Sequence, residues 1–201
     1  KNNQSSFIID NPAAYDFPSL NSEQIKEITS FQPDWLYFGT LQQMSSVAFK
    51  LTCKLFELLP KTKRFYDINL RAGFYSRKLI LELLKASSIL KLNSQETKIF
   101  CHLFNKENMN FKDFCIWVVN EFELEGVIVT MGAKGCGVYL NGDFHESEGC
   151  KVQVVDPVGA GDAFAASFIH WLDKKKELNK ICKYSNKYAA KIVSYQGAIP
   201  K

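Results

Sequence analysis

The sequence predicts an α/β protein in which helices cover a mostly parallel central sheet. Short apolar runs typical of strands alternate with longer segments whose apolar residues recur at helical spacing. This alternation implies right-handed crossovers between parallel strands. The length of 201 residues suits one domain with a substantial core and is too short to expect two. We therefore expect a single α/β domain over residues 1–201.

The stretch from Val154 to Phe168 organises this prediction, because it combines a strand, a turn of small residues and an apolar helix. Residues 163–172 carry only Ser167 and His170 as polar side chains. A helix that is apolar on nearly all sides should be buried in the core. The amides at its start must then be satisfied by a capping group or by a ligand.

Gly159, Ala160 and Gly161 precede this helix and carry almost no side chain, so a ligand can approach their amides closely. Free amides and the positive end of the helix dipole together predict an anion site, for which phosphate is the usual occupant. Asp162 stands among these amides and could accept a proton from an incoming hydroxyl. The alternative is that Asp162 is an ordinary N-cap behind ordinary turn glycines. This stretch alone leaves both interpretations open.

The composition narrows the class of protein. A hydrophobic content of 46% with 23% charged residues is typical of a soluble globular protein, and no apolar run approaches the roughly 20 residues of a membrane span. The net charge of +4 is mild and its lysines are scattered, so we expect no nucleic-acid partner. Six cysteines without a C-x-x-C pair favour reduced thiols in a cytoplasmic protein over disulfides or zinc. The chain begins without an initiator Met, as a fragment would.

The elements up to residue 130 alternate in a regular way. Apolar runs bounded by turn residues predict strands at 6–10, 35–38, 64–68, 88–92 and 127–130. Helical spacing of apolar residues behind a capping Ser or Asn predicts helices at 21–28, 45–59, 76–84, 93–104 and 110–122. The strand at 35–38 is expected to be buried, because its residues are almost entirely apolar.

The pattern changes after residue 130. Asn141-Gly142 is the strongest two-residue turn signal and predicts a hairpin over residues 135–145. A strand at 151–155 is expected to lead into the glycine turn, and a last helix is expected at 179–194. In sheets of this kind, ligands bind at the carboxyl ends of the strands. Polar or glycine-rich segments follow strands at 39–40, 67–71, 93–96, 130–135 and 159–162. Their coincidence predicts a single active site.

Two of these segments allow a structural and a functional interpretation. Asn93-Ser94-Gln95-Glu96 has the form of a capping box, and the same oxygens could hold a Mg²⁺ shell together with phosphates. Residues 130–135 carry glycines that would let the backbone approach a nucleotide, or that simply turn the chain between two strands. Their spacing is neither that of a P-loop nor that of a Rossmann fingerprint.

A third segment, Asp67-Ile68-Asn69-Leu70-Arg71, places an acid, an amide and a guanidinium at a strand end. Arg71 could steady a phosphate or a substrate oxygen, or it could form a salt bridge with a neighbouring carboxylate.

In combination, these motifs resemble the PfkB or ribokinase-like carbohydrate kinases. The sequence from Tyr37 to Gln42 and from Tyr66 to Tyr75 is most similar to the fructokinase-like branch. The resemblance covers the chain from about Phe7 to its end. It rests on four motifs in the family's order: Asp67-x-Asn69-x-Arg71, Asn93-x-x-Glu96, Thr130-x-Gly132-x-x-Gly135 and Asp156-Pro157-Val158-Gly159-Ala160-Gly161-Asp162. It implies a ribokinase-like three-layer sandwich that lacks the family's N-terminal strands and β-lid.

The resemblance also implies an activity, which is ATP-dependent phosphorylation of a sugar hydroxyl, with fructose as the first candidate. Asp162 would be the base. Three neighbouring residues would form the anion hole: Gly159, Ala160 and Gly161. Asn93 and Glu96 would organise Mg²⁺ and the phosphates.

Further roles follow from the same resemblance. The residues expected along the ATP are Thr130, Gly132, Gly135 and, near the adenine, Asn186. Asn69 and Arg71 would lie near the sugar or its phosphate. Many family members bind a monovalent cation such as K⁺ beside the anion hole, which would place Asp156 there.

Pro157 stands where the family often has Thr, and the part of the family that supplies most sugar contacts is absent from this sequence. The substrate therefore stays open among fructose, another hexose, a keto-deoxy sugar acid, ribose and a nucleoside. A non-catalytic protein of kinase-like fold is the main alternative, and a nucleotide-dependent oxidoreductase is disfavoured because no G-x-G-x-x-G joins a strand to a helix. A sheet edge left by missing strands would invite pairing in a homodimer.

Overall fold

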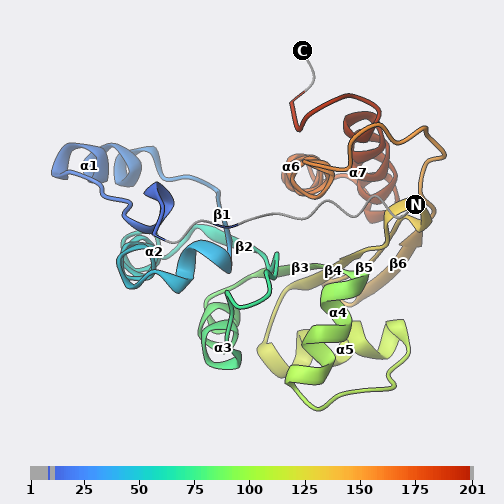
Figure 1. The fold of residues 1–201 in the computed structure, drawn as a ribbon, viewed down its shortest axis with the longest axis horizontal. Coiled ribbons are helices and arrows are strands. Elements are labelled where there is room, and N and C mark those ends of the chain that lie inside the picture. The colour runs from blue at the N-terminus through green and yellow to red at the C-terminus, as the bar shows by residue number, and fades with distance from the viewer. Residues whose placement is uncertain (1–8, 10–11, 200–201) are drawn as a thin grey trace.

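The computed structural model describes residue 9 and residues 12–199, and these residues form three layers around one sheet (Figure 1). The expected strand at 6–10 lies outside this part of the chain apart from Ile9. The strands are β1 (Trp35–Gly39), β2 (Lys63–Asp67), β3 (Ile89–Asn93), β4 (Gly126–Thr130), β5 (Cys136–Leu140) and β6 (Asp143–Ser147). The α-helices are α1 (Ser22–Phe31), α2 (Ser46–Leu58), α3 (Arg77–Lys85), α4 (Ser94–Leu103), α5 (Phe111–Phe122), α6 (Ala160–Asp173) and α7 (Leu178–Val193).

The strands follow their sequence order across the sheet, from β1 at one edge to β6 at the other. The first four are parallel, while β5 pairs antiparallel with both β4 and β6 through the turn at Asn141-Gly142. The predicted mostly parallel sheet and the predicted hairpin are therefore confirmed. Parallel alignment brings the carboxyl ends of β1 to β4 to one edge, which is where a ligand site is expected.

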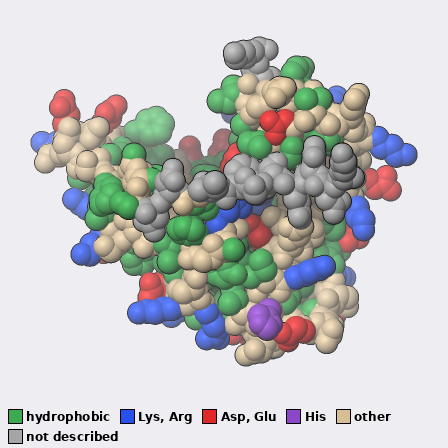
Figure 2. Space-filling view, viewed as in Figure 1, with side chains coloured by type: hydrophobic (Ala, Val, Ile, Leu, Met, Phe, Trp, Pro, Cys, Tyr) green, Lys and Arg blue, Asp and Glu red, His purple; other side chains and the backbone are tan. Residues whose placement is uncertain are grey.

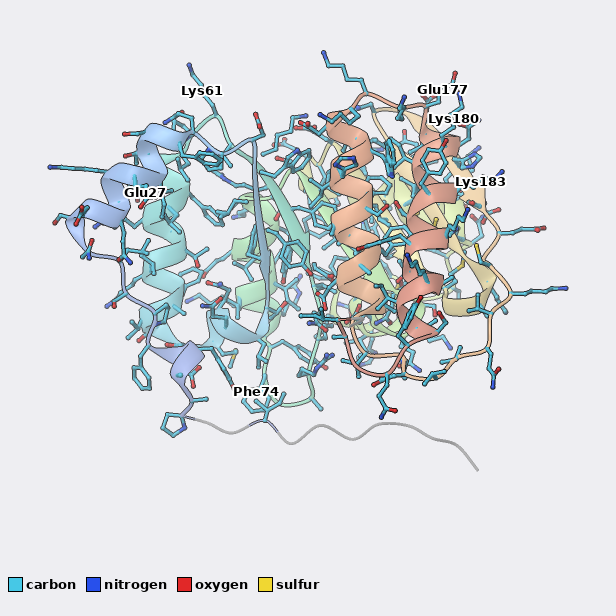
Figure 3. All side chains as sticks on the ribbon, turned by 90° about the horizontal axis from the view of Figure 1, so that it is seen from above. Glu27, Lys61, Phe74, Glu177, Lys180 and Lys183 are labelled. Atoms are coloured by element: carbon cyan, nitrogen blue, oxygen red, sulfur yellow. The ribbon has the colours of Figure 1, made fainter. Side chains whose placement is uncertain are left out.

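Alternation of side chains along the strands divides the core between the two faces of the sheet. Tyr66 and Leu90 point to the face that packs against α3, α4 and α5. Phe65 and Ile89 point to the opposite face, which is covered by α6 and α7. Figure 3 shows α6 and α7 lying side by side on that face, well away from α1 and α2. All-round apolarity of residues 163–172 thus correctly predicted that α6 lies against the sheet.

The Ser and Asn residues predicted to start the helices cap most of them with their side chains. Each of four N-cap side chains accepts hydrogen bonds from amides of its helix's first turn: Ser45, Ser76, Asn93 and Asn110. The helix expected at 21–28 also has an N-cap, Asn21, and continues to Phe31. Local sequence alone therefore determined where these helices begin.

The expected strand at 151–155 is wrong. The described structure has no strand there, and the segment runs as an extended loop between β6 and α6. Val152, Val154 and Val155 are exposed, and the amide of Val155 donates instead to the carbonyl oxygen of Val193 at the end of α7. β-branched residues favour strands only where they pair with a neighbouring strand, and in the described structure residues 151–155 do not join the sheet beside its edge strand β6.

The strand predicted as buried, β1, is an edge strand. Tyr37 is 43% exposed, whereas the neighbouring Phe38 is buried against Tyr66 at a ring separation of 5.1 Å. Apolar composition did not reveal this, because Tyr37 covers the sheet with its ring and leaves its hydroxyl accessible. Pairing of a homodimer through this edge stays a prediction.

The distribution of charged side chains on the surface agrees with the mild net charge of the chain. On the face shown in Figure 2, Lys and Arg side chains are interspersed with Asp and Glu. At the start of α7, Glu177 and Lys180 form an exposed ion pair with a separation of 2.9 Å (Figure 3).

None of the helices that the structure describes combines the length and the apolarity required to cross a lipid bilayer.

Candidate active site

The site is built around the start of α6. Its N-cap is Gly159, which has a φ of +82° and offers no side chain to the first turn. Within the described residues, the amides of Gly161 and Asp162 have no acceptor. A Cβ on Gly159 would lie 2.9 Å from Ala198, so the position requires glycine for both its backbone and its neighbour. Free amides at a helix start are what an anion hole needs.

A cavity of about 470 Å³ opens beside this helix start. Its polar wall is the turn between β4 and β5, where Thr130, Gly132 and Gly135 line it. Gly135 has a φ of +97° and its Cα faces the backbone of residues 147–149, so a side chain has no room there. The apolar part of its lining comes from aliphatic and aromatic residues, which we call the apolar wall: Val152, Val154, Phe164, Ala189, Ala190 and Val193. A lining that combines a glycine turn with apolar side chains suits a ligand with phosphates and a flat apolar ring.

Asn186 lines the same cavity from α7. Its side-chain amide donates to the carbonyl oxygens of Ser147 and Glu148, at 3.3 and 3.1 Å. Asn186 therefore ties α7 to the end of β6 and to the residue that follows it.

Asp156 fixes the turn before α6. One carboxylate oxygen accepts from the amide of Val158 at 2.9 Å, and the other accepts from the amide of Gly197 at 3.0 Å. This carboxylate thus holds the turn against the last described residues of the chain. Each oxygen keeps a further lone pair, so the predicted role beside a monovalent cation stays a prediction.

Asn93 and Glu96 form the predicted capping box at the start of α4. The Asn93 side chain accepts from the amides of Gln95 and Glu96, and Glu96 accepts from the amide of Asn93 at 2.8 Å and that of Leu70 at 2.9 Å. Glu96 is 5% exposed. Burial raises the pKa of its carboxyl group, and the hydrogen bond from Asn93 opposes that rise.

The donor set for a divalent ion is sparse. Among the described residues, no three His, Cys, Asp or Glu side chains converge as a metal cage. Mg²⁺ suits such a site, because it keeps several waters and binds one or two carboxylates together with substrate phosphates. The predicted role of Glu96 and Asn93 in organising Mg²⁺ stays a prediction, because both Glu96 oxygens accept from backbone amides.

A second cluster joins three strands to Asp162. The Lys91 ammonium donates to Asp67 Oδ2 at 2.6 Å, and both side chains are buried. The Tyr37 hydroxyl lies 2.9 Å from the same oxygen and 3.1 Å from Asp162 Oδ1. Lys91 also lies beneath the first turn of α6, 3.3 Å from where a Cβ on Gly161 would stand. Asp162 is thus connected by hydrogen bonds to residues of β1, β2 and β3.

Asn69 and Arg71 lie just past the end of β2. Asn69 is exposed with a φ of +39°, and Arg71 donates from Nη1 to the carbonyl oxygen of Leu70 at 3.2 Å. Neither residue lines the cavity beside α6. Their predicted contact with the sugar stays a prediction.

Sequence reasoning missed Tyr37, Lys91 and the apolar wall of the cavity. Lys91 carried a usable signal, since it is a charged residue inside the apolar run 88–92. A charge there must be paired, and the carboxylate at the end of the neighbouring strand was the obvious partner. Tyr37 carried no such signal, because its partner Asp162 is 125 residues away in the sequence.

Comparison with known proteins agrees with this geometry. Residues 1–201 match the profile of the pfkB family carbohydrate kinases. The fructokinase of Escherichia coli is 28% identical over 145 residues, which are 67% of this chain and 46% of that protein. The ribokinase of Dictyostelium discoideum is 37% identical over 129 residues, which are 58% of this chain and 40% of that protein. The chain therefore spans about half the length of the curated relatives it matches.

Solved structures share the fold. The crystal structure of a fructokinase from Vibrio cholerae O395, with fructose, ADP and calcium bound, superposes with a TM-score of 0.76 at 21% identity. It is matched over 93% of this chain and 62% of that one. With the family profile matching along its whole length, this chain belongs to the pfkB family of carbohydrate kinases.

Proposed function

We propose that this chain is the nucleotide-binding and catalytic part of an ATP-dependent sugar kinase. The observation that carries the proposal is the start of α6, where free amides, a cavity and the carboxylate of Asp162 meet. The amides of Gly159 to Gly161 would receive the transferring phosphoryl group. Asp162 would accept the proton of the attacking hydroxyl.

The nucleotide would lie in the cavity of about 470 Å³. Its phosphates would face the glycine turn at Gly132 and Gly135, and its adenine would lie between the apolar wall and Asn186. In-line transfer of a phosphoryl group needs little covalent help from the protein, so positioning and electrostatics would supply most of the rate.

Metal ions would complete the site. Bound Mg²⁺ neutralises charge that develops on the phosphoryl oxygens during transfer. Glu96 and Asn93 would orient its water ligands, and Asp156 would lie beside a monovalent cation such as K⁺. These assignments draw on the oxygen donors at the sheet edge and on the resemblance of the motifs to the family.

Fructose is the proposed substrate. Two relatives in different organisms are named fructokinases, and the solved fructokinase from Vibrio cholerae was crystallised with fructose. Other members of the family act on other small molecules, as the ribokinase of Dictyostelium discoideum indicates by its name. The substrate must therefore be determined directly.

The test is ADP release by the full-length gene product in the presence of Mg·ATP. Fructose would head a panel that also contains glucose, ribose, a keto-deoxy sugar acid and adenosine. We expect one of these compounds, fructose first, to raise ADP release well above the rate without a sugar. Binding of ATP with no ADP release on any member of the panel would instead indicate a non-catalytic protein of this fold.

A further inference from the structure

We infer that Tyr37 is a positioning residue that orients the carboxylate of Asp162 for proton transfer, and that the stacking of its ring on Phe65 holds its hydroxyl in place. The inference deepens the proposed function and rests on it, because it requires Asp162 to act as the base. It concerns a side chain that none of the recognised motifs includes.

The geometry of Tyr37 is defined at both ends of the side chain. Its ring stacks on Phe65 in the next strand, with a centroid separation of 5.9 Å and an interplanar angle of 21°. Its hydroxyl reaches Asp67 Oδ2 at 2.9 Å and Asp162 Oδ1 at 3.1 Å. A stacked ring in a strand has few rotamers available, so the hydroxyl is held at a fixed point between the two carboxylates.

Counting donors decides which carboxylate uses the phenol proton. Burial raises the pKa of Tyr37, and the charges of Asp67 and Asp162 raise it further, so its hydroxyl keeps its single proton. Asp67 Oδ2 already receives a hydrogen bond from the Lys91 ammonium at 2.6 Å. For Asp162, the Tyr37 hydroxyl is the side-chain hydrogen-bond partner among the residues that the structure describes. The proton of Tyr37 is therefore available to Asp162.

A hydrogen bond to Oδ1 leaves Oδ2 of Asp162 for the substrate. As the sugar oxygen bonds to the γ-phosphorus, the bond from that phosphorus to the oxygen shared with ADP breaks. The proton of the sugar hydroxyl then passes to Oδ2, while Tyr37 retains its own proton. No further reactant is needed.

Asp162 is on the first turn of α6, and without the phenol its carboxylate would be free to rotate. Neither Tyr37 nor Asp162 lines the nucleotide cavity, which is formed by the turn after β4, the loop before α6, other residues at the start of α6, and α7. Loss of the hydroxyl should therefore reduce turnover and leave ATP binding unchanged.

The test replaces Tyr37 by Phe in the full-length gene product, which removes the hydroxyl and keeps the ring that stacks on Phe65. We expect Y37F to lower kcat about tenfold or more while the KM for ATP changes less than about twofold. The control is Y188F, because Tyr188 is an exposed tyrosine on α7. Y188F should keep normal kcat and KM, and both variants should keep the melting temperature of the parent.

A double-mutant cycle separates this inference from the proposed function. D162N should lower kcat strongly, and adding Y37F to D162N should change kcat less than about twofold, because the carboxylate to be oriented is gone. Equal losses from Y37F in both backgrounds, or a normal kcat in Y37F alone, would overturn the role of Tyr37 and leave Asp162 as the base. A normal kcat in D162N, or no phosphoryl transfer by the parent, would overturn the proposed function and this inference with it.

Discussion

The helices α4 and α6 both begin at the ligand-facing edge of the sheet, and they satisfy the amides of their first turns in opposite ways. In α4, Asn93 accepts from two amides and Glu96 accepts in return from the amide of Asn93. In α6, Gly159 is the N-cap and supplies no side chain. A helix start offers its amides to a ligand only where its own side chains leave them free.

The contrast explains why two similar motifs are expected to differ in function. Both segments place a carboxylate in the first turn of a helix, Glu96 in α4 and Asp162 in α6. Glu96 is buried with both oxygens bound to backbone amides, whereas Asp162 is exposed and is bound by Tyr37 through one oxygen. We therefore expect substitutions in α6 to act on turnover and substitutions in α4 to act mainly on stability.

The largest effect is expected from D162N, which keeps the shape of the side chain and removes the base. Turnover should fall about 10²-fold to 10⁴-fold in a steady-state assay of ADP release. The free energy of unfolding in urea should change by less than about 1 kcal/mol, because the side chain loses little more than its attraction to the helix dipole. Near-normal turnover in this variant would remove Asp162 from the proposed mechanism.

The second prediction concerns Gly159, the N-cap residue of α6, which has no side chain to cap the helix. G159A should lower the free energy of unfolding by about 2 kcal/mol, because a left-handed backbone costs an alanine about 1–2 kcal/mol and its Cβ would also press on Ala198. Gly73 is the matched control, with a φ of +81° and open space within 4 Å of the point that a Cβ would occupy. G73A should therefore show the backbone cost alone. Equal losses in urea unfolding of the two variants would show that the contact with Ala198 carries no cost.

A comparable effect is expected when α4 loses a buried acceptor. E96Q replaces one oxygen with an amide group, so either Leu70 or Asn93 loses the acceptor for its backbone amide. The unfolding free energy should fall by about 1–3 kcal/mol. Glu121 is exposed on α5, and E121Q should stay within about 0.5 kcal/mol of the parent. If the urea midpoint of unfolding is the same for E96Q and the parent, the hydrogen bonds of Glu96 contribute little to stability.

The smallest effect sharpens the comparison between capping and ligand binding. N93A and N110A each remove an N-cap side chain, from α4 at the site and from α5 away from it, and each should cost about 1 kcal/mol of stability. Only Asn93 is proposed to lie near the phosphates, so only N93A should raise the KM for ATP. An unchanged KM for ATP in N93A would show that Asn93 acts only as the N-cap of α4.

Much of the site was predictable because its parts are local. The capping box at Asn93 and Glu96, the turn at Asn141-Gly142 and the glycines before α6 depend on residues that are neighbours in the sequence. Short-range hydrogen bonds and backbone preferences determine such features. The expected strand at 151–155 shows the limit, because a strand also needs a partner, and the described chain places none beside it.

The sequence by itself determined the alternation of strands and helices, the helix starts and the small residues that leave the amides of α6 free. Only the tertiary structure decided that Tyr37, Asp67 and Lys91 meet behind Asp162. Tyr37 reaches Asp67 across 30 residues of sequence and Asp162 across 125, and Lys91 reaches Asp67 across 24. The charged Lys91 in an apolar run signals that a partner is needed, but no local pattern encodes the contacts of Tyr37, because they arise from the parallel register of β1, β2 and β3 and from the packing of α6 above them.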